Sequence, residues 1–447
     1  MGVPPTDSTI TGRMPVPGPT GSGEADHVFV GFGFGPIQAG LFAKEAFQSG
    51  RFKRIVVAEI DQALVDAVRS NGGVYHVNVA GRDGVEAVRV EGLALLNPMA
   101  SEEADALRKV LAEATEVVTS LPSVDFYDSE QDNSVAALIA AGLRQRTSEA
   151  TILYAAENNN RAAEILREAI SHRLNAPLPP RVQPLNTVIG KMSQVVTDPA
   201  EVADRGLAPI APGIDRAFLV EEFNRILVSK TTIPGFRPGI EVFIEKDDLL
   251  PFEEAKLYGH NAIHALLGFL GMLKGYSKMT EIQDDDALMQ VGRKAFLDES
   301  GGALVRKYAS LGEALFTEAG YRRYAEDLLE RMTNLHLGDT VARAGRDVVR
   351  KLGPDDRIFG TMNLALEYGI EPRNMAIGAL AGIALLVADG RYDVPDVLRP
   401  ASWQDLSRAD LARLLTWVWQ GRTPDRSDDL IERTWRAREP LARLVGR

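Results

Sequence analysis

A run of small residues between an apolar strand and an amphipathic helix constrains the fold of this chain most strongly. Val28–Phe32 reads as a short apolar strand, and Ile37–Gln48 has helical periodicity. Glycines are concentrated between them, and a second apolar strand follows at Ile55–Ile60. Strand, glycine turn, helix and strand in this order form a βαβ unit, whose strands lie parallel in one sheet.

The same alternation continues along the first half of the chain. Val74–Val90 alternates apolar and polar residues, as β-structure does. The periodicity then predicts helices over 104–113, 135–144 and 160–171, and strands over 116–120 and 150–156. This pattern predicts an α/β domain, an open doubly wound sheet of the Rossmann type with helices on both faces.

The character of the sequence changes after about residue 200. From Val220 onward the periodic segments are helical, separated by turn signals such as Gly-Pro-Asp-Asp. We predict helices over 221–227, 251–272, 285–297, 302–307, 322–332, 340–352, 357–368, 374–388, 410–420 and 428–441. Residues 1–26, rich in Pro, Gly, Ser and Thr, are expected to be a disordered tail. The predicted organisation is therefore a tail (1–26), a Rossmann-type domain (27–215) and a mainly α-helical domain (216–447).

Composition excludes several classes of function. The formal net charge of −12 argues against non-specific binding of nucleic acid, which needs a basic face. The chain has no cysteine, which removes disulfides, thiolate chemistry and cysteine-ligated zinc. The longest uncharged apolar run, Ala376–Ala388, is too short to span a bilayer, and no signal-peptide pattern opens the chain. We therefore expect a cytoplasmic protein that binds neither nucleic acid nor membrane.

The glycine turn predicts a dinucleotide site. Small residues let a backbone approach a pyrophosphate, and the helix that follows offers unpaired N–H groups. The strict G-x-G-x-x-G is not met: reading from Gly31 places Pro36 at the third position, and reading from Gly33 ends at Gly40. The predicted cofactor-binding residues of the turn are Gly31, Gly33, Phe34, Gly35, Pro36 and Ile37.

Glu59 ends the second strand, where an acidic side chain binds the ribose 2′-OH and repels a 2′-phosphate. No arginine follows it directly, so NAD is favoured over NADP. The alternative is a glycine turn in another α/β protein, with Glu59 exposed.

A second constellation, K-x-x-x-x-N-x-x-H, lies in the helical half at Lys256, Asn261 and His264. At about 100° per residue Asn261 and His264 are neighbours, and Lys256 falls within an arc of roughly 140° with both. A cation, an amide and an imidazole on one side of a helix can perform proton chemistry on an oxygen. Three polar residues on a helix more often simply face solvent.

Oxidation of a secondary alcohol needs a proton acceptor and donors to the developing alkoxide. A zinc ion could polarise that oxygen, but the chain has no cysteine and only six scattered histidines, so we expect no metal. A lysine beside a positively charged nicotinamide can have its pKa lowered towards neutrality, which suits Lys256 as the base. Asn261 and Asn158 can donate to the oxygen, although one of Asn158, Asn159 and Asn160 is expected to cap a helix.

His264 is expected to orient Lys256 or to bind a neighbouring hydroxyl. His260 falls between Lys256 and His264 on the helical wheel, so it can be the buried histidine; we include it among the substrate-binding candidates.

A basic cluster, Arg343, Arg346, Arg350 and Lys351, has spacings that place it largely on one side of a predicted helix. Arginine suits bidentate recognition of phosphate, but a solvated basic face is an equally good interpretation.

Taken together, these motifs resemble those of a known family, the polyol-specific long-chain dehydrogenases. The resemblance runs over about residues 27 to 390. It rests on the Gly33–Gly40 register, Leu138–Arg144, Glu157-Asn158, the Lys256, Asn261 and His264 signature, and Arg350-Lys351-Leu352 followed by Asp356-Arg357. Two departures affect the expected substrate: Ala39 stands where the family has an arginine, and Lys191-Met192-Ser193 replaces an Arg-Ile-Val-Pro type run.

The resemblance implies catalytic roles for Lys256, Asn261, His264 and Asn158, and places Thr119 beside the cofactor. It also implies substrate contacts from the basic segment, so we expect Arg343, Arg346 and Lys351 to bind a phosphate or distal hydroxyls.

The expected function is an NAD-dependent, metal-independent oxidoreductase that interconverts a polyol phosphate and a keto-sugar phosphate. A dehydrogenase of free polyols, sugar acids or cyclitols is the alternative enzyme, and a non-catalytic nucleotide-binding regulator is the alternative of another class. The apolar residues of the C-terminal helices could belong either to a core or to an interface, so the sequence is compatible with a monomer and with a homodimer.

Overall fold

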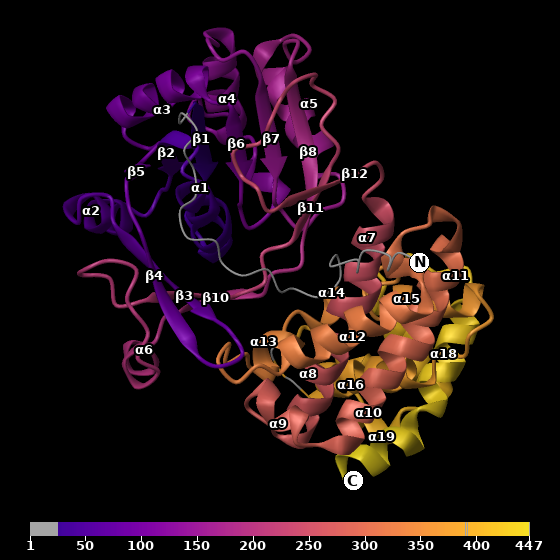
Figure 1. The fold of residues 1–447 in the computed structure, drawn as a ribbon. Helices are drawn as coiled ribbons and strands as arrows, with labels where there is room; N and C mark the ends of the chain where they lie inside the picture. Colours follow the sequence, from indigo (N-terminus) through magenta and orange to yellow (C-terminus); the bar gives the residue numbers. More distant parts are fainter. Residues whose placement is uncertain (1–25, 389, 391, 447) are drawn as a thin grey trace, which may run out of the picture. The chain divides into compact units, whose positions relative to one another are not determined.

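The computed structural model describes residues 26–388, 390 and 392–446 (Figure 1). All but Asp26 of the predicted tail therefore lies outside the described residues. The chain divides between Leu250 and Pro251 into two compact units. Among the described residues, no helix has the length and apolar character needed to cross a membrane.

The first unit alternates strands and helices in chain order. Its strands are β1 (His27–Phe32), β2 (Phe52–Ala58), β3 (Tyr75–Ala80), β4 (Val85–Val90), β5 (Leu93–Leu96), β6 (Glu116–Thr119), β7 (Thr151–Ala155), β8 (Val182–Ile189), β9 (Ser193–Val196), β10 (Ala217–Glu221), β11 (Ile226–Ser229) and β12 (Phe243–Lys246). Its helices are η1 (Gln38–Ala43), α1 (Lys44–Ser49), α2 (Gln62–Ser70), α3 (Ser101–Glu113), η2 (Val124–Phe126), α4 (Val135–Arg144), α5 (Ala162–Leu174) and α6 (Pro199–Asp204).

Eight strands form one sheet in the order β12-β11-β8-β7-β6-β1-β2-β5. The six strands from β8 to β5 pair in parallel, and β11 joins β8 in the antiparallel sense. These six strands have the doubly wound order. From β1 the chain first adds strands on one side, β2 and β5, and then adds β6, β7 and β8 on the other side, so the switch point lies between β1 and β6. A smaller sheet has the order β4-β3-β10-β9. The predicted Rossmann-type sheet is thus confirmed.

Two apolar cores cover the faces of the large sheet. Residues of α3, α4 and α5 pack on one face, with Leu107, Leu138 and Leu166 among them. On the other face η1, α2 and the small sheet enclose Phe42 and Val65. Covering of both faces explains why the central strands of this parallel sheet are largely apolar.

The predicted domain boundary after residue 215 is corrected by β10, β11 and β12, which join the sheets of the first unit. The helix predicted over Glu221–Leu227 is also wrong, because this segment contains the end of β10, a turn and the start of β11. Short apolar runs have too few residues for periodicity to distinguish a strand from a helix.

The described residues of the second unit form helices, as predicted. They are α7 (Leu250–Glu254, its first residue just before the boundary), η3 (Ala255–Asn261), α8 (Ala262–Lys274), α9 (Met279–Gln283), α10 (Asp286–Lys294), η4 (Ala295–Gly301), α11 (Gly302–Tyr308), η5 (Ala309–Leu311), η6 (Ala314–Phe316), α12 (Glu318–Met332), α13 (Val341–Gly345), α14 (Val348–Lys351), α15 (Phe359–Glu367), α16 (Arg373–Ala388), η7 (Asp396–Leu398), η8 (Trp403–Asp405), α17 (Arg408–Val418), α18 (Ser427–Arg436) and α19 (Arg438–Val445).

Helix α8 lies at the centre of this unit and packs against α13 and α16. A glycine permits the closest approach: a Cβ added to Gly268 would lie 2.7 Å from Cβ of Ala344 in α13. Such small separations are the reason for glycine at helix contacts. The approach brings the first turn of α8 next to the residues that precede α13.

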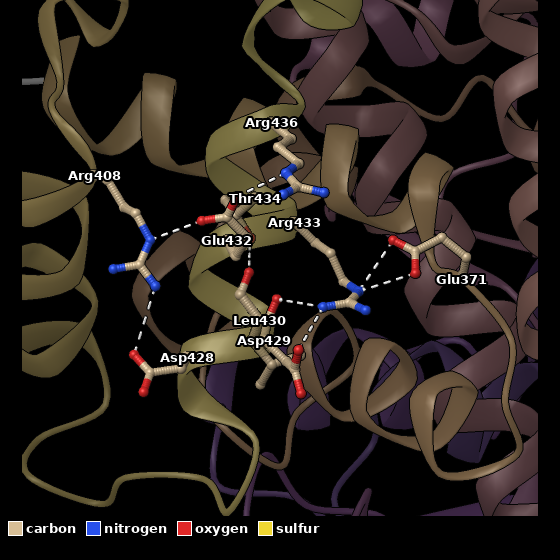
Figure 2. A network of polar contacts seen from close by, with 9 residues as sticks. All are labelled: Glu371, Arg408, Asp428, Asp429, Leu430, Glu432, Arg433, Thr434 and Arg436. Atoms are coloured by element: carbon tan, nitrogen blue, oxygen red, sulfur yellow. Dashed lines mark hydrogen bonds and ion pairs between the residues drawn. The ribbon is translucent and has the colours of Figure 1, made fainter.

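Ion pairs fasten α18 to its neighbours at the surface (Figure 2). Arg408 of α17 contacts Asp428 and Glu432, and Arg433 contacts Asp429 and Glu371. Most of these side chains are partly exposed, so each pair contributes roughly 0–1 kcal/mol at most. The buried apolar side of α18, including Leu430 and Ile431, contributes more to holding it in place.

Candidate active site

The glycine turn lies at the carboxyl edge of the parallel sheet, directly after β1. Gly33 has φ +81°, and a Cβ there would lie 2.7 Å from the carbonyl oxygen of Ser120. Gly40 lies in η1, where a Cβ would be 2.5 Å from Val220. Both positions therefore require glycine, one for the turn and one for packing of the helix on the small sheet. Pro36 occupies the first helical turn, where its missing N–H costs nothing.

Gln38 occupies the third position of the register that begins at Gly33. Its side chain is fully buried, and neither its amide nitrogen nor its amide oxygen has a hydrogen-bond partner among the described residues. Its nitrogen lies 1.8 Å from where a Cβ of Gly31 would stand, so Gly31 makes room for it. Around Gly35, by contrast, an added Cβ would meet no atom within 4 Å. An open glycine and an orphaned buried amide in one turn fit a bound dinucleotide.

Glu59 follows β2 at the same edge and holds the turn. Its Oε2 accepts from the backbone N–H of Phe34 at 2.8 Å, and its Oε1 accepts from Asp61 at 2.8 Å. The Phe34 ring points into the core, against Tyr75 and Phe218. The Phe34 side chain is therefore not available to a cofactor, so only its backbone could provide the predicted contact, while Glu59 retains lone pairs that can accept further hydrogen bonds.

Thr119 ends β6 and belongs to a buried polar cluster. Its hydroxyl donates to Oε2 of Glu157 at 2.9 Å, Tyr127 donates to the same oxygen, and the Leu121 N–H donates to Oε1 at 2.9 Å. Burial raises the pKa of Glu157, although the hydrogen bonds from Tyr127 and Leu121 oppose this shift. The sequence had paired Glu157 with Asn158 but gave no sign that Tyr127 and Thr119 would hold it.

Asn158 is exposed after β7, at the carboxyl edge that also carries Glu59 and Thr119. The expected helix cap is not found: the N-cap residue of α5 is Arg161, without a side-chain cap, and Oδ1 of Asn159 accepts from the N–H of Arg161 at 2.8 Å in the turn before the helix. The structure therefore brings the glycine turn, Glu59, Thr119 and Asn158 to one edge of the first unit.

Lys256 and Asn261 lie in η3, a π-helical segment, rather than in the predicted continuous α-helix. In an α-helix positions five apart are separated by roughly 140° around the axis. The π-helical i→i+5 pattern has more residues per turn, so the angle between positions five apart is smaller. The π-helical segment therefore places the two positions nearer to the same side of the helix than an α-helix would, and such segments are frequent at functional sites.

Lys256 is partly buried, and burial followed by the positive charge of Arg357 lowers its pKa to about 8. His260 is buried beside it, and burial holds the pKa of this imidazole well below its usual value. The rings of His260 and His264 lie 6.4 Å apart and nearly perpendicular. His260 is thus the buried histidine, as predicted, and His264 faces a neighbouring segment.

His264 contacts Asp339, a residue that the sequence analysis missed. Its Nε2 lies 2.9 Å from Oδ2 of Asp339, and Oδ1 of Asp339 lies 2.8 Å from Arg343. Asp339 is separated from His264 by 75 positions, so no local pattern could indicate the pairing.

The basic segment does not form one helical face, which corrects the predicted helix over Thr340–Leu352. α13 ends at Gly345, and Asp347 adopts the left-handed conformation with φ +57° before α14 begins. Arg346 consequently points outward, with its side chain 69% exposed. Lys351 is buried and donates to the carbonyl of Ala344 at 2.6 Å, and burial, followed by Arg357, lowers its pKa to about 7.

A cavity of about 440 Å³ lies in the first unit, walled by Tyr154, Phe236 and Phe243, with Arg51 and Glu241 among its lining. None of the predicted site residues lines it. In the described part of the chain, no group of three or more His, Asp or Glu is arranged to hold a metal ion.

Comparisons with known proteins show what this chain is similar to. Residues 248–389 match the family model of the mannitol dehydrogenase C-terminal domain. A mannitol-1-phosphate 5-dehydrogenase from Brevibacillus brevis is 29% identical over 360 residues, covering 79% of this chain and 85% of the relative.

Two solved structures share the fold over almost the whole length. The substrate-free D-sorbitol dehydrogenase covers 93% of this chain and 94% of its own, with a TM-score of 0.72 and 16% identity. The Pseudomonas fluorescens mannitol 2-dehydrogenase, a ternary complex with NAD and D-mannitol, covers 94% and 93%, with a TM-score of 0.67 and 19% identity. The resemblance to the mannitol dehydrogenase family and the fold class predicted from sequence are confirmed.

Proposed function

We propose that this protein is a metal-independent polyol-phosphate dehydrogenase of the mannitol 1-phosphate and fructose 6-phosphate type, with Lys256 as its acid and base. The resemblance to this family supports an NAD-dependent oxidoreductase that acts on a CH–OH group. The phosphorylated substrate is supported by the Brevibacillus relative, whose name specifies mannitol 1-phosphate.

The state of Lys256 carries the proposal. A lysine with a pKa of about 8 exchanges its proton near neutral pH, whereas an ordinary surface lysine stays charged. Burial and the positive charge of Arg357 produce this state. The π-helical turn adds an amide from Asn261 on the same side of the helix.

When bound, NAD would supply the hydride acceptor for oxidation, and its reduced form NADH would supply the hydride donor for the reverse reaction. The open turn at Gly35, the buried amide of Gln38 and the carboxylate of Glu59 would hold it. In oxidation, neutral Lys256 accepts the hydroxyl proton at Nζ; in reduction, the ammonium form returns it. Asn261 donates an N–H to the same oxygen as negative charge develops there. Asn158 is proposed as a further amide donor, and His264 as a ligand of a neighbouring hydroxyl.

The direct test is NADH oxidation by the purified full-length protein with fructose 6-phosphate, run beside free fructose. We expect kcat/KM for fructose 6-phosphate to exceed that for fructose by at least tenfold, because charge-assisted hydrogen bonds to a phosphate contribute about 1.5–3 kcal/mol. Equal or inverted values would contradict a phosphorylated substrate and leave the oxidoreductase class intact.

One observation favours a second candidate, a dehydrogenase of free polyols. Arg346 is exposed, and Arg343 is already paired with Asp339. Of the three residues expected to bind a phosphate, Arg343 is therefore engaged by a carboxylate and Arg346 extends into solvent, which favours a substrate without a phosphate. Turnover of fructose or another free ketose in preference to its phosphate would support this candidate.

A further inference from the structure

Asp339 is a buried carboxylate with three hydrogen-bond donors around it. It is 2% exposed and lies just before α13. Oδ1 accepts from the N–H of Thr340 at 2.9 Å and pairs with Arg343 at 2.8 Å, while Oδ2 faces Nε2 of His264 at 2.9 Å. Burial alone would raise the pKa of Asp339, but His264 and Arg343 hold it well below its usual range. The carboxylate is therefore ionised and acts only as an acceptor.

This arrangement fixes the proton of the His264 imidazole. A neutral imidazole carries one N–H, and a carboxylate can pair only with the nitrogen that bears it. Because Nε2 faces Asp339, the proton belongs on Nε2, and the lone pair remains on Nδ1. Nδ1 has no hydrogen-bond partner among the residues that the structure describes, and the His264 side chain is 18% exposed.

We propose that Asp339 is a positioning residue that holds His264 as the Nε2–H tautomer, so that Nδ1 accepts a hydrogen bond from a substrate hydroxyl. The same carboxylate fixes Arg343, so one buried group sets the direction of two side chains proposed to contact the substrate. This substrate role rests on the proposed function, whereas the tautomer assignment does not.

Substitution of Asp339 by asparagine gives a sharp expectation. The Thr340 N–H and Arg343 both require an acceptor, so the amide oxygen of an asparagine would face them. Its NH₂ group would then face Nε2 of His264 and donate to it, which drives the ring proton to Nδ1. Asp339→Asn should therefore invert the tautomer, much as replacing the aspartate of a catalytic triad gives the wrong tautomer.

The first experiment measures the ring nitrogens directly by ¹⁵N NMR of protein labelled at histidine, at an alkaline pH. The chain has six histidines, and His264→Asn identifies the signal that belongs to His264. We expect a protonated Nε2 in the wild type and a protonated Nδ1 in Asp339→Asn. A wild-type Nδ1–H, or the same tautomer in both proteins, would overturn the assignment whether or not the protein turns over any sugar.

The second experiment separates a positioning role from a structural one by kinetics. In a wild type that reduces fructose 6-phosphate, Asp339→Asn should raise KM for the sugar about tenfold or more, while the dissociation constant for NADH stays unchanged. When His264→Asn is already present, adding Asp339→Asn should raise the KM for the sugar much less, because the two residues act as one unit.

Asp285→Asn is the matched control. Asp285 is also a poorly exposed aspartate of the second unit, paired with Lys274, but it caps α10. Its loss should lower the melting temperature without changing the KM for the sugar. An inverted tautomer with an unchanged KM would overturn the substrate role of the pair. Absence of turnover in the wild type would instead contradict the proposed function and leave the NMR result to decide the tautomer.

Discussion

Lys256 and Asn261 lie five residues apart in the π-helical segment η3, and this segment interrupts what would otherwise be a continuous helix from α7 to α8. A π-helical turn carries one more residue per hydrogen-bonded ring than an α-helical turn and is less stable in isolation. It is retained here next to a lysine whose pKa is lowered to about 8. The less stable π-helical segment therefore coincides with the position of the proposed functional groups Lys256 and Asn261.

Substitutions at Gly33 and Gly35 should distinguish the contribution of the turn to folding from its contribution to cofactor binding. Gly33→Ala places a side chain in the left-handed region and against Ser120, so it should lower the free energy of unfolding by about 1–3 kcal/mol. Gly35→Ala meets no neighbouring atom, so stability should change by less than about 0.5 kcal/mol. Its methyl group should nevertheless weaken NADH binding, measured by fluorescence titration. If Gly35→Ala binds NADH as tightly as the wild type does, the cofactor does not approach this turn.

Glu59 should determine both cofactor affinity and cofactor choice. Glu59→Gln removes the charge that repels a 2′-phosphate and weakens the bond to a ribose hydroxyl. The dissociation constant for NADH should rise roughly tenfold to a hundredfold, corresponding to about 1.5–3 kcal/mol. The preference for NADH over NADPH should narrow at the same time. Glu102→Gln, an exposed carboxylate in the first turn of α3, serves as the control, and an identical response in both variants would refute the role of Glu59.

Lys351 should make substrate affinity depend on pH. Its pKa is lowered to about 7, so it is charged below pH 7 and loses its charge as the pH rises. If Lys351 holds a phosphate, the KM for fructose 6-phosphate should rise from pH 6 to pH 8 in the wild type. In Lys351→Met the KM should be roughly tenfold higher at pH 6 and should rise less.

Arg346→Ala provides the comparison for Lys351, because Arg346 is exposed and should affect the KM less. Identical pH dependence in the wild type and Lys351→Met would place the phosphate elsewhere.

Arg357 should tune the proton affinity of Lys256. Its positive charge is the second cause, after burial, of the lowered pKa of Lys256. Arg357→Gln should therefore shift the pH dependence of turnover to higher pH, which steady-state rates over a pH series would detect. Arg350→Gln is the matched control, since Arg350 is largely exposed and is not among the charges that act on Lys256. A shift of equal size in both variants would mean that the long-range charge of the unit, rather than Arg357, sets the pKa.

The sequence predicted the structural positions of those candidate site residues whose signals are local. A glycine turn after an apolar strand identified Gly33 and Glu59, because their positions follow from the geometry of a βαβ unit. The left-handed conformation of Asp347 could not be predicted, because asparagine and aspartate tolerate this conformation without a distinctive sequence pattern around them. Asp339 could not be found either, because a contact with His264 across 75 positions depends on how α8 and α13 pack.

The pH dependence of kcat/KM in both directions tests the central claim, that Lys256 is the acid and base. Oxidation needs the neutral amine, so its kcat/KM should rise with pH and level off above a pKa near 8. Reduction needs the ammonium form, so its kcat/KM should be highest below that pKa and fall above it. Both limbs should vanish in Lys256→Met, together with most of the turnover, while NADH still binds. Limbs that run in the same direction, or that persist in Lys256→Met, would contradict the account.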